Sequence, residues 1–163
     1  MTADRVWATR RIAAPAAKVF DIVSSPEGHV LIDGSGMLTA AVGTQRPNAV
    51  GETFDMDMDR RPLNDIPDLT DYQVRNTVTR IIPDRLFEWG IGGVNTPPLG
   101  HVYGWEIEPE GDGACEVTNY CDWTGIGEEL RSRREWPIVP VEMLERSVHN
   151  LERIVTEAQG EDS

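Results

Sequence analysis

One apolar stripe near the end of the chain constrains the fold more than any other feature. After Pro140, which is suited to the first turn of a helix, apolar residues recur at spacings of three and four: Val141, Leu144, Val148, Leu151, Val155 and Ala158. This period predicts a helix of about five turns with one apolar face. Because so long an apolar face must be buried, we expect a large apolar surface elsewhere in the chain on which the helix lies.

Most of the preceding sequence predicts short strands that together supply such a surface. The clearest strand is 51–59, where Phe54, Met56 and Met58 alternate with aspartates, so that one face is apolar and the other charged. Similar patterns predict strands at 5–13, 37–42, 72–82, 86–91, 101–108 and 115–124. Short turns join the later strands, which favours an antiparallel meander.

Two short helices are expected between the first two strands. Pro15 is suited to a first helical turn, and the residues after it carry an apolar stripe up to Val23. A second short helix is predicted at 27–32, and the proline-containing segment 60–70 is predicted to be a loop. The expected fold class is therefore α+β, with a curved seven-stranded antiparallel sheet wrapped around the long C-terminal helix.

The length and charge of the chain restrict its organisation and partners. A chain of 163 residues fits one domain, predicted at 1–159 with an acidic tail at 160–163. The net charge of −13 argues against nucleic acid and against anionic membrane surfaces, both of which are bound through Lys and Arg. We find no signal peptide and no apolar segment long enough to span a bilayer, so we expect a cytoplasmic protein.

The residues that bind metals and common cofactors lack the spacings such sites require. Cys115 and Cys121 form no CxxC pair, and we expect both to be reduced residues of the core or of a cavity wall. The three histidines are scattered, and no HExxH, phosphate-binding or dinucleotide-binding glycine motif occurs. Asp55, Asp57 and Asp59 alternate on a strand and are expected to face water. We therefore expect no metal and no cofactor.

Three segments resemble one known superfamily. The segment RRIAAPAAKVFDIVSSPEG (10–28), the hairpin EPEGDGACEVTNYCDW (108–123) and the helix LERSVHNLERIVTEA (144–158) are similar to the opening, the penultimate hairpin and the closing helix of START-like, or helix-grip (SRPBCC), proteins, in particular their polyketide cyclase/dehydrase-like branch. The order of elements also matches. One departure is the stretch HVLIDGSGM (29–37), which lacks the aromatic residue that members often carry near the first helix–helix corner.

The resemblance implies an internal cavity for a lipid, polyketide, steroid or aromatic metabolite. Residues on the predicted inner faces of the strands and of the last helix are candidates for its wall. They are mostly apolar, with a few polar groups that could orient a guest. The candidate ligand-binding residues are Phe54, Met56, Met58, Trp89, Ile91, His101, Tyr103, Trp105, Asn119, Trp123, Met143, Leu144 and Val148.

Three of these candidates could also carry chemistry. His101 could act as an acid or base, the Tyr103 hydroxyl could polarise a carbonyl group, and Asn119 on the neighbouring strand could add an amide donor. Such a set suits aldol-type cyclisation or dehydration. Alternatively, His101 lies at an exposed rim, because it directly follows a Pro-Pro-Leu-Gly loop.

Further polar residues allow two readings each. His29 and Asp33 have the spacing of one helix face and form either a polar pair at a cavity mouth or a surface contact. Arg131, Arg133 and Arg134 form either a solvated cluster or partners for an acidic ligand group. His149 lies off the apolar stripe and is expected to be solvated.

Three functions follow as hypotheses. The first is a binding or carrier domain for a small apolar or aromatic metabolite. The second is a cofactor-independent polyketide cyclase or dehydratase that uses His101, Tyr103 and Asn119. The third is a protein-interaction module, which a cavity filled by side chains would favour. Fold alone does not decide among them.

Overall fold

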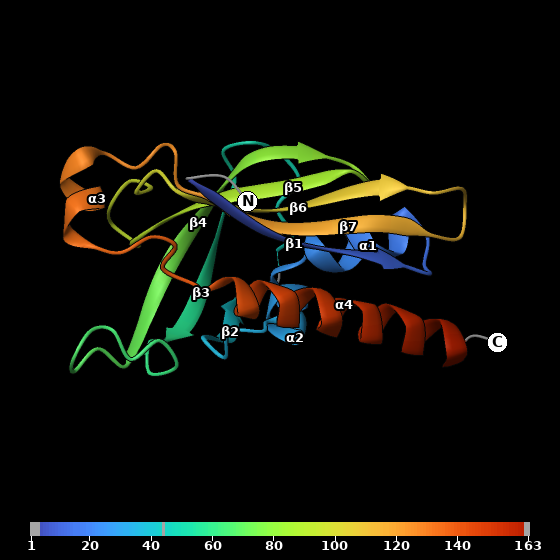
Figure 1. Cartoon of the computed structure of the whole chain (residues 1–163), viewed down its shortest axis with the longest axis horizontal. Coiled ribbons are helices and arrows are strands. Elements are labelled where there is room, and N and C mark those ends of the chain that lie inside the picture. Colours follow the sequence, from blue (N-terminus) through green and yellow to red (C-terminus); the bar gives the residue numbers. More distant parts are fainter. Residues whose placement is uncertain (1–3, 44, 162–163) are drawn as a thin grey trace.

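The computed structural model describes residues 4–43 and 45–161, and of residues 158–161 it describes the backbone only. Within these ranges the chain forms one seven-stranded antiparallel sheet and four helices (Figure 1). The elements are β1 (Arg5–Ile12), α1 (Ala16–Val23), α2 (Pro26–Ile32), β2 (Leu38–Val42), β3 (Thr53–Asp59), β4 (Asp71–Ile82), β5 (Leu86–Gly92), β6 (Val102–Pro109), β7 (Cys115–Asp122), α3 (Glu128–Arg133) and α4 (Val141–Glu161). The predicted α+β helix-grip fold is confirmed.

The sheet is a meander to which the first strand is added at the far edge. The strand order is β1-β7-β6-β5-β4-β3-β2, so β2 to β7 follow one another and β1 lies beside β7. β1 pairs with β7 along its whole length, from Arg5 opposite Asp122 to Ile12 opposite Cys115. The chain between β1 and β2 forms α1 and α2, which therefore lie across the sheet and cover part of its inner side (Figure 1).

Irregularities in strand pairing help the sheet to curve around α4. The register shifts between Val78 and Arg80 where β4 pairs with β5, and between Leu38 and Ala40 where β2 pairs with β3. Such bulges bend a strand and increase its twist. In Figure 1, β3 and β4 turn down toward the side of the sheet on which α4 lies.

The alternation of residues along the strands matches their burial. In β3, Phe54, Met56 and Met58 are buried, whereas the aspartates between them lie on the outer face, where Asp55 pairs with Arg75. Apolar side chains of the inner face form two neighbouring core clusters, one under α4 with β1, β6 and β7, and one around β3, β4 and β5. The two free cysteines are buried, as expected.

The first short helix begins as the sequence predicts, α2 begins at Pro26, one residue before its predicted start, and α3 is an additional helix. α1 starts directly after Pro15, and the Ser25 side chain caps α2 by accepting a hydrogen bond from the Gly28 N–H at 3.2 Å. α3 was not expected from the sequence. None of its residues is buried, so it carries no apolar stripe from which a helix could be predicted.

The end of α4 reaches into the predicted tail. Ala158, the last position of the predicted stripe, has a helical backbone, and its side chain lies outside the described part. The helix continues to Glu161, and residues 162–163 also lie outside the described part. Among the helices that the structure describes, none has both the length and the apolar character needed to cross a bilayer. The predicted domain boundary at residue 159 stays a prediction.

Candidate functional site

A cavity of about 510 Å³ lies between the first half of α4 and the inner face of the sheet. Its wall includes residues of β3 to β7, the loop after α2, the loop 60–70 and the segment between α3 and α4. It reaches the surface beside Leu99, whose side chain is exposed. The volume falls within the range of small-molecule pockets, about 300–1,000 Å³.

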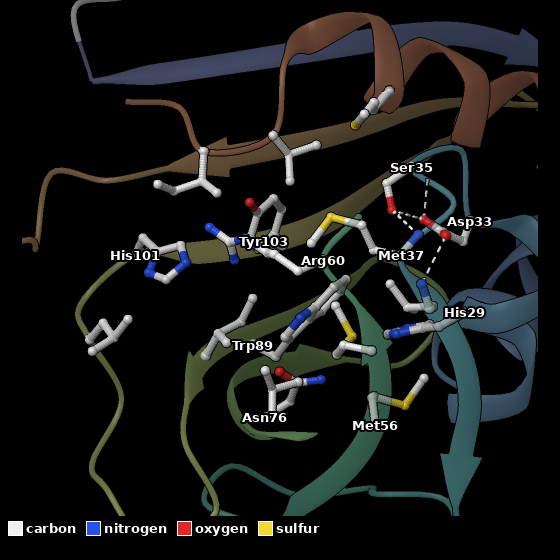
Figure 2. A pocket seen from close by; sticks show the side chains of 18 of the residues that line it. His29, Asp33, Ser35, Met37, Met56, Arg60, Asn76, Trp89, His101 and Tyr103 are labelled. Carbon is white, nitrogen blue, oxygen red and sulfur yellow. Dashed lines mark hydrogen bonds between the residues drawn. The ribbon is translucent and has the colours of Figure 1, made fainter. Parts of the chain in front are cut away.

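Most of the predicted wall residues line this cavity. Phe54, Trp123 and Val148 do not, because they pack within the core clusters next to it. The predicted residues that the structure brings together around the cavity are Met56, Met58, Trp89, Ile91, His101, Tyr103, Trp105, Asn119, Met143 and Leu144. Figure 2 shows several of them converging from opposite sides.

Methionines give this wall an adaptable surface. Met37, Met56, Met58 and Met143 all line the cavity. The thioether side chain is flexible and polarisable, so it can adjust to guests of irregular shape. Met37 precedes β2, and the sequence assigned it to a strand without predicting that it faces the cavity.

His29 lies inside the molecule, at one end of the cavity. Its ring packs 4.5 Å from the Trp89 ring and 5.6 Å from the Phe87 ring, measured between centroids, and its side chain is 4% exposed. Its Nε2 lies 2.6 Å from the Val23 carbonyl oxygen, so Nε2 carries the proton and Nδ1 is left as an acceptor. Burial lowers the pKa of His29 from 6.5 to about 4, so the ring is neutral at pH 7.

The alternative of a surface contact between His29 and Asp33 is therefore wrong. Asp33 ends α2, and its carboxylate accepts hydrogen bonds from the Ser35 N–H, the Ser35 hydroxyl and the Leu38 N–H. These contacts shape the loop that closes the cavity beside α4. The i,i+4 spacing was a poor guide because the helix ends at Ile32, which leaves Asp33 in the turn.

Arg60 was missed by the sequence analysis, because it lies at the start of a predicted loop. It is 8% exposed and lines the cavity. Its Nε and Nη2 atoms bind the two Asp65 carboxylate oxygens at 2.8 and 2.6 Å, and its Nη1 lies 3.3 Å from the Tyr72 hydroxyl. Because Asp65 balances the Arg60 charge, the pair adds hydrogen-bonding groups to the wall without a net charge.

His101 stands out among the polar residues of the wall. It precedes β6 and is 5% exposed, so the alternative that it lies at an exposed rim is not met. Its ring centroid is 5.7 Å from that of Tyr103 and 5.1 Å from that of Trp136. No hydrogen-bond partner reaches its buried Nδ1, and burial lowers its pKa from 6.5 to about 4.

A close contact between two loops holds His101 in place. Gly100 has a φ of +116°, which favours glycine, and a Cβ at this position would lie 2.4 Å from the Gly125 carbonyl oxygen. The loop before β6 therefore lies directly against the loop after β7. This contact places the neighbouring His101 at the cavity wall.

Tyr103 lies beside His101 on the wall, whereas Asn119 lies opposite Trp105, four positions farther along the chain than His101. Burial raises the pKa of Tyr103 well above 10, so its hydroxyl keeps its proton at neutral pH. The Asn119 Nδ2 already donates to the Gly104 carbonyl oxygen at 3.0 Å. Asn119 thus fixes its own position, and it is less free to donate to a guest than the sequence suggested.

The arginines near α3 have separate roles. Arg131 binds Asp4 at 2.8 Å and the Trp123 carbonyl oxygen at 3.0 Å, and Arg133 pairs with Glu129. Arg134 lines the cavity. The three residues therefore do not act as one cluster, and His149 is exposed as expected.

The part of the chain that the structure describes contains no group of three or more His, Cys, Asp or Glu side chains that could hold a metal ion. The acidic side chains of β3 pair instead with neighbours on the outer face, for example Asp57 with Gln73 at 2.7 Å.

The fold and the cavity together define a helix-grip protein with an internal cavity between the sheet and its long helix. Comparison with known families agrees with this class. Residues 3–157 match the family described as "Polyketide cyclase / dehydrase and lipid transport", and the chain belongs to this family. The superfamily resemblance drawn from the sequence is thereby confirmed.

Relatives extend this picture. The chain is 32% identical over 123 residues to the uncharacterized protein Rv0088 of Mycobacterium tuberculosis. The match covers 76% of this chain and 49% of that protein, so the chain spans about half the length of this relative.

Solved structures share the fold at low sequence identity. CV1439 from Chromobacterium violaceum has a TM-score of 0.63 at 13% identity, over 93% of this chain and 97% of that one. Ms6760 from Mycobacterium smegmatis has a TM-score of 0.62 at 16% identity, over 94% and 92%. A norcoclaurine synthase mutant from Thalictrum flavum, solved with a transition-state analogue, has a TM-score of 0.63 at 13% identity, over 98% and 99%.

Proposed function

We propose that this protein binds and carries a small apolar or aromatic metabolite, of lipid, polyketide or steroid-like character, in its internal cavity. The observation that carries this proposal is the cavity of about 510 Å³ with a wall of aromatic, methionine and aliphatic side chains. Burial of an apolar guest against such a wall is favourable by roughly 25 cal/mol per Å² of apolar surface removed from water, before the cost of association.

The family and the electrostatics support the same proposal. The family description joins lipid transport with cyclase and dehydrase activity, and an apolar cavity would suit a guest of either kind. The Arg60–Asp65 pair is internally balanced, and both buried histidines are neutral at pH 7, so the buried part of the wall favours uncharged guests. Arg134, which also lines the cavity, is only half-buried. The buried free cysteines and the net charge of −13 suit the cytoplasmic location that we also propose.

Two measurements test the carrier function. Native mass spectrometry of the protein purified from its own host, followed by denaturing extraction, should show a co-purified apolar metabolite. A fluorescence titration with pyrene should then show saturable binding of about one molecule per chain. A bare mass together with no saturable pyrene binding would contradict the proposal.

A pair of matched variants ties binding to the cavity. Ile91→Phe adds a ring to the wall and should weaken pyrene binding at least about tenfold, because overpacking excludes the guest. Ile82→Phe makes the same change at an exposed position at the end of β4 and should leave binding unchanged. Equal effects of the two variants would place the guest outside the cavity.

A second candidate function is a cofactor-independent cyclase or dehydratase. The specific observation in its favour is His101, a neutral and buried imidazole without a partner at Nδ1, beside a protonated Tyr103. In an aldol cyclisation His101 would take a proton from the carbon between two carbonyl groups. The resulting enolate carbon would form a bond to another carbonyl carbon, and the oxygen of that carbonyl would take back the proton held by His101.

This second function predicts turnover that depends on His101. A synthetic poly-β-ketone thioester incubated with the protein should give a cyclised product by mass spectrometry, and His101→Ala should abolish turnover while pyrene still binds. Turnover that persists in His101→Ala would remove this assignment. The third hypothesis, an interaction module with a filled cavity, is not favoured, because the cavity is open.

A further inference from the structure

We propose that the guest carries one carboxylate group, and that this group pairs with Arg134 while the apolar body of the guest lies in the buried part of the cavity. The inference rests on the proposed carrier function and narrows its ligand class. It follows from a cation in the cavity wall that the protein itself leaves unpaired.

Arg134 differs from the arginines that precede it. Arg131 and Arg133, on α3, bind the carboxylates of Asp4 and Glu129 at 2.8 and 2.6 Å. Arg134 directly follows α3, and within the described part of the chain its side chain forms neither a hydrogen bond nor an ion pair. It is half-buried and lines the cavity. Because the chain has 28 acidic against 15 basic residues, a shortage of carboxylates does not explain the unpaired arginine.

The charge of Arg134 lies close to the Arg60–Asp65 pair in the same wall. The pKa of Asp65 is lowered mainly by its hydrogen bonds from Arg60, and the charge of Arg134 adds to this effect to a smaller extent. Arg60 already binds both carboxylate oxygens of Asp65, at 2.8 and 2.6 Å. Two guanidinium groups therefore share one carboxylate, which leaves a positive charge in excess. In Figure 1 the segment after α3 and the loop 60–70 lie at the same end of the molecule.

Other charges of the protein limit the anion to a single negative charge. Asp33, the acidic residue among the described lining residues, belongs to the loop after α2, where its carboxylate accepts from the Ser35 and Leu38 N–H groups. The net charge of −13 opposes an anion at long range, but salt screens exposed charges beyond about 8 Å. The same net charge disfavours a dianion, such as a phosphate monoester, more strongly than a carboxylate.

The chemistry of a guanidinium group also selects a carboxylate. Its planar set of N–H donors matches the two oxygens of a carboxylate, and such charge-assisted bonds are stronger than neutral ones. The buried part of the wall cannot hold the charge, because Arg60 is balanced by Asp65 and both buried histidines are neutral at pH 7. The favoured class is therefore an amphipathic monocarboxylic acid, with its acid group at the half-buried Arg134 and its apolar body farther inside.

A matched pair of fluorescent probes tests this inference: 1-pyrenebutyric acid and 1-pyrenebutyramide. The two share their ring and chain, and they differ in an end group that is anionic at pH 7 in the acid and uncharged in the amide. The protein should bind the acid about fivefold tighter than the amide, because only the acid pairs with the Arg134 charge. A merely apolar wall in a protein of charge −13 would instead bind the amide more tightly.

Variants assign the preference to one arginine. Arg134→Gln should bring the ratio of acid to amide affinity close to one, and Arg134→Lys, which keeps the charge but not the planar donor set, should retain a preference of about twofold. Arg153→Gln is the matched control, because Arg153 is an exposed residue of α4 that forms no ion pair in the described part and does not line the cavity. It should keep the fivefold ratio. Thermal unfolding of each variant confirms that it is folded.

The outcomes separate this inference from the carrier function. Binding of both probes without a preference for the acid would overturn the inference and leave the carrier function standing. A preference that survives in Arg134→Gln, or that is lost equally in Arg153→Gln, would overturn the assignment to Arg134. If the wild-type protein binds neither probe and does not bind pyrene, the carrier function fails, and the inference fails with it.

Discussion

The two halves of α4 carry one continuous apolar stripe but face different surroundings. In the second half, Leu151 and Val155 are almost completely buried in the core that includes Ile12 and Val117. In the first half, Met143 and Leu144 face the open cavity. The same periodicity thus supports close packing at one end and a cavity wall at the other. Helical period predicts which face is covered, and it does not predict whether the space opposite is filled.

Polar contacts add to the packing of Val148 in the first half of α4. The Gly34 N–H donates to the Ser147 hydroxyl at 2.8 Å, and the Asn150 Nδ2 donates to the Ile32 carbonyl oxygen at 3.2 Å. A Cβ at Gly34 would lie 2.4 Å from the Met143 carbonyl oxygen, so the loop after α2 touches the helix backbone. Directional bonds therefore hold the helix beside a space that apolar contacts do not fill.

Truncation of one leucine in each half should give the largest difference. Leu151→Ala should lower the free energy of unfolding by about 4 kcal/mol, because it leaves a void in a fully packed core. Leu144→Ala should cost only about 2 kcal/mol, because one side of Leu144 already faces a cavity. Urea denaturation of both variants measures the difference. Equal losses would mean that the two halves are packed alike.

Acidification should destabilise the elements around the cavity more than the packed core under the second half of α4. The reason is that both buried histidines line the cavity. For His29 the folded pKa, about 4, lies below the unfolded value of 6.5, so the unfolded state binds the proton more strongly. The stability that the neutral His29 ring contributes is fully present above pH 6.5 and is lost as the pH falls toward 4. The loss from His29 is on the order of 3 kcal/mol.

Urea denaturation at pH 7 and at pH 4.5 measures this effect. His29→Gln, which keeps a donor for the Val23 carbonyl oxygen, should reduce the difference between the two pH values. His149→Gln removes an exposed histidine from the same protein and serves as the control. Hydrogen exchange at pH 4.5 should rise first in α2 and β5, and a uniform rise over the whole sheet would argue against a selective effect.

Removal of one hydroxyl group should have the smallest effect. Ser147→Ala leaves the Gly34 N–H without its partner and should cost about 1 kcal/mol. Thr156→Val removes a hydroxyl that bonds only to carbonyl oxygens of its own helix, Glu152 at 2.7 Å and Arg153 at 3.3 Å, and should change stability by less than about 0.5 kcal/mol. If the two substitutions cost the same, polar contacts do not hold the first half of the helix.

The fold was predictable from the sequence because its main signals are periodic. The alternation in β3 and the stripe of α4 each repeat over many residues, and burial of those faces leaves few arrangements. α3 was missed because it buries no side chain, and therefore lacks this signal.

The cavity was harder to predict than the fold. Strand alternation placed Met56 and His101 on the inner face, but it does not separate a wall residue from a packed neighbour such as Phe54. Arg60 and Trp136 lie in irregular segments whose direction depends on tertiary contacts. His29 was misjudged because a single polar residue on a short helix reads as exposed, whereas here a backbone carbonyl oxygen and three aromatic rings surround it.

The contact of Gly100 with Gly125 bears on how such a cavity can diverge during evolution. Neither position tolerates a Cβ without displacing the backbone of the other loop, so a change in one loop requires a compensating change in the second. By contrast, the loop 60–70 contributes side chains such as Ile66 and Leu69 to the cavity wall. New guest preferences are therefore more accessible through substitutions in the loop 60–70, while the two glycines preserve the frame that holds His101.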